Sequence, residues 1–160
     1  MASKKKSSKS TQERSSSQNA IALLKADHKA VKALFQQFDD ARTATQKQKL
    51  AETICRELTV HTQIEEEIFY PAAREAIEDS DLLDEAAVEH QSAKELISQI
   101  EDGSPDDELW DAKVKVLGEY INHHVKEEET ELFPEVRQAE LDLKALGAQL
   151  LERKQELQTE

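Results

Sequence analysis

Apolar residues recur every three or four positions in several long stretches of the chain, which is the period of an amphipathic α-helix. These stretches cover residues 20–40, 45–70, 81–101 and 105–133. The residues on the four apolar stripes are Ile21, Leu24, His28, Val31, Phe35 and Phe38; Leu50, Ile54, Leu58, His61, Glu65 and Ile68; Leu83, Ala86, His90, Ala93, Ile97 and Ile100; Trp110, Val114, Leu117, Ile121, His124, Glu128 and Leu132. The pattern therefore predicts four helices, each with a polar residue inside its apolar stripe.

Turn signals separate the predicted helices. Pro71 ends or kinks the second helix, and Asp79 to Asp81 form a turn before the third. Gly103 then closes the third helix, while Ser104 is the predicted N-cap of the fourth and Pro105 its first residue. Short connections of this kind favour an up-down-up-down antiparallel four-helix bundle, which brings the four stripe histidines into one layer.

The two ends of the chain differ from the predicted helical domain, which covers residues 20–137. Residues 1–19 are rich in Ser and Lys and show no periodicity, which predicts a disordered basic tail. Residues 138–160 carry a looser pattern of leucines. We expect them to form an additional C-terminal helical segment that packs on the bundle or serves in self-association.

Composition supports an all-α fold. The 160 residues include only three glycines, three prolines and 4% aromatics, whereas an all-β fold needs many more turn residues. The single cysteine, Cys55, cannot form an intramolecular disulfide, and no apolar run has the ~18 residues of a membrane span. These features predict a soluble cytoplasmic protein that is a monomer or a weak homodimer.

The charge is unevenly distributed. Residues 1–20 hold five basic side chains and one acid, so the net charge of −13 becomes −17 in residues 21–160. A strongly acidic surface repels phosphate backbones. We therefore expect neither nucleic-acid nor membrane binding by the helical domain.

A five-residue motif occurs twice, as His61-Thr-Gln-Ile-Glu65 and His124-Val-Lys-Glu-Glu128. The two copies are 63 residues apart, and the preceding histidines His28 and His90 are 62 apart. Residues i and i+4 lie on one face of a helix, so each copy directs one imidazole and one carboxylate to the same place. The duplication predicts a pair of metal ions between two related helix pairs.

The predicted metal ligands are the six polar residues of the stripes: His28, His61, Glu65, His90, His124 and Glu128. Burying an unpaired carboxylate costs several kcal/mol, and no Lys or Arg lies on the stripes near this layer. Histidine and carboxylate ligands suit iron better than zinc. Six protein ligands cannot saturate two six-coordinate ions, which leaves positions for a bridging oxygen and a small exogenous ligand. Hydrogen-bonded core histidines are the alternative.

Several neighbouring polar residues lie off the stripes. The helical period places His123 toward solvent. It also places the remaining acids of the two motifs on a solvated face, although Glu66 or Glu129 could reach the layer; these acids are Glu66, Glu67, Glu127 and Glu129. Cys55 is predicted to be a packing residue, and nothing in the sequence gives Tyr70 a catalytic role.

At these motifs the chain resembles the hemerythrin-like HHE cation-binding family. The resemblance covers about residues 20–137 and includes Asp27-His28, Glu89-His90 and both His-x-x-x-Glu motifs. It implies a four-helix bundle holding two non-haem iron ions with a bridging oxo or hydroxo group. It also implies small ligands such as O2, NO or H2O2.

Two departures from the oxygen-carrying members affect the expected function. Lys94 occupies the position of a further histidine ligand, and Glu128 replaces an aspartate that lies five residues after its histidine. We therefore expect sensing, scavenging or stress protection rather than oxygen transport. A peroxidase-like or catalase-like enzyme is one alternative function. A helical interaction module with a structural polar core is another.

Overall fold

The computed structural model describes residues 19–78 and 80–159, so all of the predicted N-terminal tail except Asn19 lies outside the described residues. The described residues form α-helices and two π-helical turns, with no strand among them. This confirms the predicted all-α fold class.

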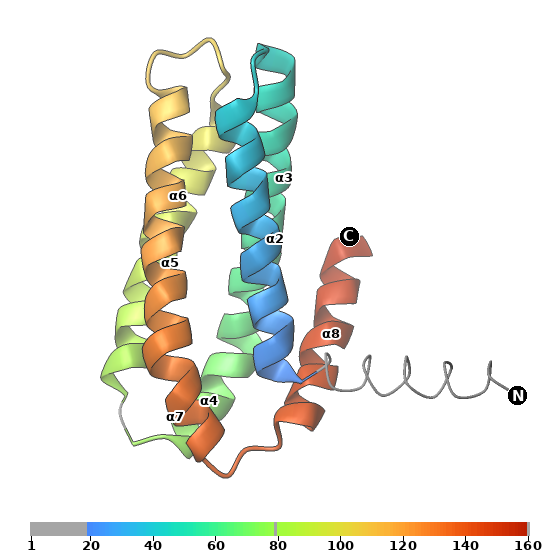
Figure 1. The fold of residues 1–160 in the computed structure, drawn as a ribbon, viewed down its shortest axis with the longest axis vertical. Helices are drawn as coiled ribbons and strands as arrows, with labels where there is room; N and C mark the ends of the chain where they lie inside the picture. The colour runs from blue at the N-terminus through green and yellow to red at the C-terminus, as the bar shows by residue number, and fades with distance from the viewer. Residues whose placement is uncertain (1–18, 79, 160) are drawn as a thin grey trace, which may run out of the picture.

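Four long helices form an up-down-up-down bundle: α2 (Ala20–Asp40), α3 (Ala44–Ile64), α5 (Asp81–Asp102) and α6 (Trp110–Glu127) (Figure 1). Helix α3 continues through a π turn, η1 (Glu65–Phe69), into α4 (Tyr70–Ala76). Helix α6 likewise continues through a second π turn, η2 (Glu128–Leu132), into α7 (Phe133–Gln138). A final helix, α8 (Leu143–Thr159), lies beside the lower part of the bundle.

Side chains at the starts of α2 and α3 satisfy free backbone amides. Asn19 Oδ1 accepts from the backbone N–H of Ile21 at 2.8 Å and of Ala22 at 3.2 Å. Thr43 Oγ1 accepts from the N–H of Gln46 at 3.1 Å. These caps set where α2 and α3 begin.

The two π turns correct the prediction that the second and fourth helices run unbroken to residues 70 and 133. In each turn a backbone N–H reaches back five residues, from Tyr70 to the carbonyl of Glu65 and from Phe133 to that of Glu128. A proline, Pro71 or Pro134, lies two residues after the end of each turn. In a regular α-helix its ring clashes with the carbonyl four residues earlier, and the wider turn relieves that clash.

The start of the last long helix is also corrected, from Pro105 to Trp110. Residues 104–110 instead form two successive tight turns, in which the backbone N–H of Asp107 donates to the carbonyl of Ser104 at 3.0 Å and that of Trp110 to the carbonyl of Asp107 at 3.2 Å. Trp110 is buried, and its indole N–H donates to the carbonyl of Ile100 at 3.1 Å. The helix therefore begins where its tryptophan is anchored.

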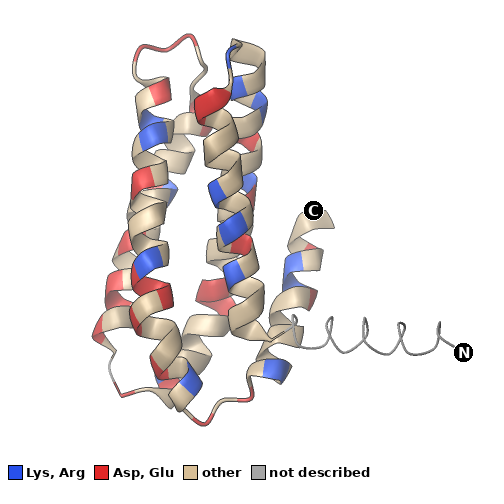
Figure 2. Cartoon of the chain, viewed as in Figure 1, with Lys and Arg blue, Asp and Glu red and all other residues tan. Residues whose placement is uncertain are grey.

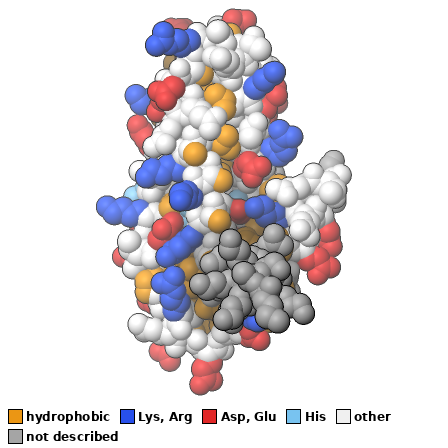
Figure 3. All heavy atoms as spheres, turned by 45° about the vertical axis from the view of Figure 1, so that its right-hand side comes forward, with side chains coloured by type: hydrophobic (Ala, Val, Ile, Leu, Met, Phe, Trp, Pro, Cys, Tyr) orange, Lys and Arg blue, Asp and Glu red, His pale blue; other side chains and the backbone are white. Residues whose placement is uncertain are grey.

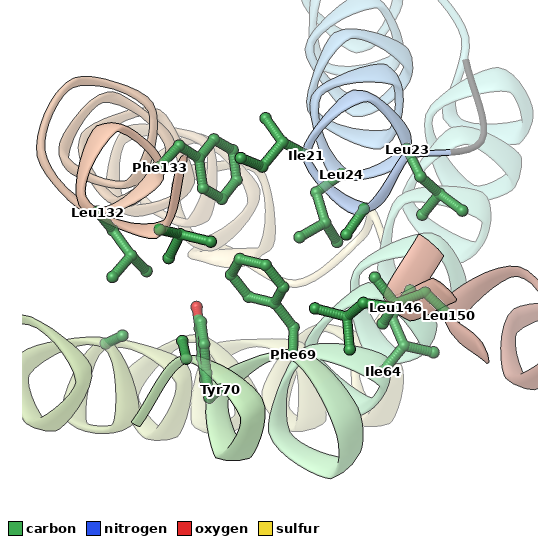
Figure 4. Packing of buried hydrophobic residues seen from close by; sticks show 14 of the residues in the cluster. Ile21, Leu23, Leu24, Ile64, Phe69, Tyr70, Leu132, Phe133, Leu146 and Leu150 are labelled. Atoms are coloured by element: carbon green, nitrogen blue, oxygen red, sulfur yellow. The ribbon is translucent and has the colours of Figure 1, made fainter. Parts of the chain in front are cut away.

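Buried apolar residues form two clusters, one at each end of the bundle. One cluster includes Leu24, Ile64, Phe69 and Phe133 together with Leu146 and Leu150 of α8 (Figure 4). The other includes Val31, Leu58, Ile97 and Leu117. The four stripe histidines lie in sequence between members of the two clusters, so the polar layer has an apolar cluster on each side.

Charged residues of both signs are spread along the helices (Figure 2). On the face shown in Figure 3, acidic and basic side chains surround the hydrophobic side chains that reach the surface. None of the described helices combines the length and apolar composition needed to cross a bilayer.

Candidate metal centre

The structure buries all six predicted ligands and brings them together in the polar layer. Their exposed fractions are no more than 8%, and that of Glu65 is 0%. Within each of two groups, one ligand atom per residue lies within 4.8 Å of the others. The first group is His28, His61, Glu65 and Glu128, and the second is Glu65, His90 and His124. Glu65 belongs to both groups.

The separations between imidazole and carboxylate atoms are short and similar. His28 Nε2 lies 3.1 Å from Glu128 Oε1, and His61 Nε2 lies 3.2 Å from Glu65 Oε1. The Nε2 atoms of His90 and His124 lie 3.3 and 3.2 Å from Glu65 Oε1 and Glu128 Oε2. Two ligand atoms at right angles around an ion about 2.1 Å away would be roughly 3 Å apart. The spacing therefore fits shared metal ions.

Several of these atoms have no hydrogen-bond partner among the described residues, even though neighbouring polar atoms are close. They are His28 Nε2, His61 Nε2, Glu65 Oε1, Glu65 Oε2 and Glu128 Oε1. His28 Nε2 and His61 Nε2 each face a carboxylate oxygen 3.1 or 3.2 Å away, so a shared proton or a metal ion would have to satisfy these atoms in the protein interior. Buried polar atoms in native proteins are normally satisfied, and metal ions would satisfy these.

The other ring nitrogen of each histidine, Nδ1, contacts a carboxylate. The four pairs are His28 with Glu129 at 2.7 Å, His61 with Asp27 at 3.0 Å, His90 with Glu66 at 3.1 Å and His124 with Glu89 at 2.8 Å. A carboxylate at Nδ1 favours the tautomer with its proton there and leaves the Nε2 lone pair free for a metal. In all four imidazoles, Nε2 is therefore the nitrogen available to a metal ion.

Two of these carboxylates follow the alternative that the sequence left open, in which Glu66 or Glu129 reaches the layer. Glu66 and Glu129 are about one-third exposed, yet each also reaches the imidazole of a neighbouring helix. Helical period describes one helix at a time and gives no information about the groups that an adjacent helix presents. The carboxylates that orient the ligands are visible in the sequence only as repeated neighbours of the ligands.

Tyr70 is a further residue of the layer that the sequence did not assign. Its hydroxyl donates to Glu128 Oε2 at 2.6 Å and lies 3.2 and 3.3 Å from the Nε2 atoms of His90 and His124. The five-residue backbone bond of η1 stacks Tyr70 one turn above Glu65, which brings it into the bundle interior (Figure 4).

The two repeated motifs differ at the position of Tyr70. Phe133 occupies the position in the second motif that Tyr70 has in the first, and its ring stacks on His28 with centroids 6.0 Å apart. One half of the layer therefore has a hydroxyl donor and the other an apolar ring.

Burial by itself disfavours the charged form of each group in the layer, but the mutual attraction of these groups prevails. The carboxylates of Glu65 and Asp27 raise the pKa of His61 to about 10. Those of Glu128 and Glu89 raise the pKa of His124 to about 11. The pKa of Glu65 falls well below its usual value because His61 is close. In the metal-free protein, protons therefore occupy positions that an ion would take.

Burial and the nearby Glu128 and Glu65 carboxylates raise the pKa of Tyr70 well above its usual value. The phenol therefore stays protonated and can act as a hydrogen-bond donor to Glu128.

Two further candidate residues lie outside the layer. The His123 side chain is 66% exposed and lies 3.0 Å from Glu127, which agrees with its predicted orientation toward solvent. Cys55 is buried in the apolar cluster that contains Val31 and Leu117, as predicted for a packing residue. Burial raises the pKa of its thiol to about 12, so the thiol is unreactive.

A cavity of about 20 Å³ adjoins the histidines. Its lining includes all four stripe histidines and apolar side chains such as Val31, Leu58 and Ile121. A cavity of this size holds about one water-sized molecule. The cavity therefore leaves room for one very small molecule beside the candidate ligands.

The fold is similar to that of a crystal structure of a hemerythrin HHE cation binding domain-containing protein from Mycobacterium kansasii, a homologue of Rv2633c. The two chains are 22% identical, with a TM-score of 0.75 over 88% of each chain. At this identity the likeness concerns the fold.

A protein of Nostoc sp. (strain PCC 7120) that is named a DNA nickase is 30% identical over 119 residues. The match covers 74% of this chain but only 34% of the nickase, so the chain spans about a third of that relative's length.

The model of the hemerythrin HHE cation binding domain matches residues 19–136, which include both histidine–glutamate motifs and all six candidate ligands. The match covers most of the chain and confirms the resemblance seen in the motifs. The chain belongs to the hemerythrin HHE cation-binding family.

Proposed function

We propose that the protein binds two non-haem iron ions through the six candidate ligands and uses them to interact with O2, NO or peroxide. Membership of a cation-binding family supports metal binding. The observation that carries the two-ion proposal is the position of Glu65. Its carboxylate belongs to both ligand groups, is fully buried, and has no hydrogen-bond partner for either oxygen among the described residues. A carboxylate can bridge two cations through its two oxygens.

The donor set favours iron among the first-row metals. Imidazole and carboxylate ligands suit iron, and the layer has no thiolate, because Cys55 lies in a separate apolar cluster. Six ligands leave coordination positions for a bridging oxo or hydroxo group and for an external ligand. Bound iron would supply the redox chemistry, while the chain positions the ligands and excludes bulk water.

The size of the adjoining cavity supports a small ligand. A cavity of about 20 Å³, lined by the four histidines and by apolar side chains such as Val31 and Leu58, suits a ligand of one or two heavy atoms, such as O2 or NO, better than a larger molecule. Together with the departures from the oxygen carriers at Lys94 and Glu128, this favours sensing, scavenging or stress protection.

Metal analysis of one variant and a matched control tests the proposal. Wild-type protein loaded anaerobically with ferrous iron should bind two ions per chain, and exposure to air should produce a near-ultraviolet oxo-to-iron band. Glu65→Ala should lose both ions, because Glu65 belongs to both ligand groups. Glu131→Ala removes an exposed carboxylate from η2 and should behave as wild type. A folded wild-type protein that takes up no iron would refute the proposal.

A second candidate is a peroxidase-like or catalase-like activity, and the hydroxyl of Tyr70 favours it. This hydroxyl lies inside the layer, 2.6 Å from Glu128, where it could stabilise a bound peroxide by donating a hydrogen bond. Steady peroxide turnover by the iron-loaded wild type, absent in Glu65→Ala, would favour an enzyme over a binding protein.

A structural polar core and a nickase activity have weaker support. A purely structural core would have to satisfy with protons alone the five buried atoms that have no hydrogen-bond partner among the described residues. We do not extend the nickase activity to this chain, because the net charge of −13 repels a phosphate backbone. The predicted cytoplasmic location and the monomeric or weakly dimeric state stay predictions.

A further inference from the structure

Helix α8 begins after the residues that match the family model, which end at 136. It packs on the bundle through Leu146 and Leu150, both buried in the cluster that also contains Leu24 and Ile64. Figure 1 shows α8 alongside the lower part of α2, the helix that carries His28. The packing brings the C-terminal half of α8 toward the polar layer.

Lys154 of α8 connects this helix to a candidate metal ligand. Its Nζ donates to Asp27 Oδ1 at 2.6 Å, and the other oxygen of Asp27 lies 3.0 Å from Nδ1 of His61. The Nε2 atom of the same ring is 3.2 Å from Glu65 Oε1. A continuous polar chain therefore runs from α8 through Asp27 and His61 to the proposed bridging carboxylate.

The Lys154–Asp27 pair is well placed to restrict motion. The two side chains are 21% and 10% exposed, so water screens their attraction less than it would on an open surface. Because Asp27 is held at both oxygens, its carboxylate cannot rotate without breaking one contact. An anchored carboxylate in turn fixes the orientation of the imidazole.

The second ligand group has a more exposed counterpart. Lys94 Nζ lies 2.6 Å from Glu66, whose other oxygen contacts Nδ1 of His90 at 3.1 Å. Here the lysine and glutamate side chains are 46% and 36% exposed. Pairs this exposed contribute little. Lys94 therefore provides a matched comparison for Lys154.

We propose that α8 is part of the metal centre, and that Lys154 is a positioning residue that holds Asp27 and thereby His61. The helix then stabilises an ion in the group of His28, His61, Glu65 and Glu128 in preference to the group of His90 and His124. This inference rests on the proposed binding of two ions.

Anaerobic ferrous titrations of the full-length protein, followed by calorimetry, test it. Two binding phases are expected for the wild type, and His90→Ala identifies the phase that belongs to the first group. Lys154→Met should weaken that phase about tenfold, the lower end of the effect of losing a group that orients a metal ligand. The other phase should be unchanged. Lys94→Met should leave the first-group phase unaltered, and Lys154→Arg should restore most of the affinity.

Asp27→Asn provides an independent variant, because it keeps the side-chain size and removes the charge that Lys154 binds. It should reproduce the selective loss, and circular dichroism of each metal-free variant checks the fold. Wild-type phases in both Lys154→Met and Asp27→Asn, or equal loss of both phases, would overturn the inference. A wild type that binds fewer than two ions would instead contradict the proposed function.

Discussion

Each histidine of the layer directs Nε2 inward and has a carboxylate at Nδ1. The six candidate ligands could be predicted from the sequence because an imidazole or carboxylate on an apolar stripe is costly to bury without a partner. Their supporting carboxylates were less obvious, although the sequence contains a signal. Asp27 and Glu89 each precede a ligand, while Glu66 and Glu129 each follow one. The repeat therefore extends to the residues that orient the ligands.

Tyr70→Phe tests the contribution of the only hydroxyl donor that the structure records to Glu128. The ring should still fit, since Phe133 occupies the equivalent position in the second motif. Loss of the donor leaves a buried carboxylate oxygen unsatisfied, which should lower the free energy of unfolding of the metal-free protein by about 1–3 kcal/mol. Urea denaturation measures this change.

Phe69→Leu is a suitable control for Tyr70→Phe, because it changes a neighbouring buried ring without touching a polar group. Its effect should not depend on metal loading, whereas metal binding should offset part of the Tyr70→Phe loss. Equal stability of wild type and Tyr70→Phe without metal would show that the hydroxyl bond contributes nothing.

Among the helices, the π turns were the feature that periodicity could not show. A regular period of 3.6 residues per turn predicts that Ile68 lies on the buried stripe, but the buried residues are Phe69 and Tyr70. The extra residue per turn rotates the chain after Glu65, and the same rotation follows Glu128. Both turns begin at a proposed ligand, so they rotate the following aromatic residues toward the metal layer.

Helix α8 should be an integral part of the fold, and Leu150→Ala tests this. Leu150 is fully buried, and removing a buried leucine side chain costs about 2–5 kcal/mol. We expect one cooperative unfolding transition at a lower urea concentration. Gln149→Ala, an exposed change on the preceding residue, should leave the midpoint nearly unchanged. If Leu150→Ala left the midpoint unchanged, α8 would not be part of the cooperative unit.

The protein as a unit places a charged layer between two apolar clusters. Apolar packing above and below keeps water out and makes the electrostatic interactions within the layer strong. Without a metal ion, the negative charge of the buried carboxylates is balanced by protonated histidines. The stability of this state should therefore depend on pH in a way that metal binding changes.

In the metal-free protein, the pKa values of His61 and His124 rise from 6.5 to about 10 and about 11. Their protonation stabilises the fold fully below about pH 6.5, and this stabilisation is lost as pH rises toward 10–11. The pKa of Glu65 is lowered, so its ionised carboxylate stabilises the fold near neutral pH, and this stabilisation is lost in acid. Urea midpoints of the metal-free protein should therefore fall between pH 6.5 and 10.

The metal-loaded protein should show a flatter profile over the same range. A bound ion requires neutral imidazoles that keep only the Nδ1 proton, so they lose no proton over this pH range, and binding itself should release protons. Indistinguishable pH profiles with and without metal would contradict the proposed ligation by His61 and His124.

The sequence by itself determined the four-helix bundle and the six buried polar residues, because periodicity and the cost of burying charge are local properties of each helix. It could not locate the π turns, the hydroxyl of Tyr70 beside Glu128, or Lys154 behind Asp27. Lys154 lies 127 residues from Asp27 along the chain. Contacts of this kind depend on how helices pack against one another, and only the tertiary structure decides that packing.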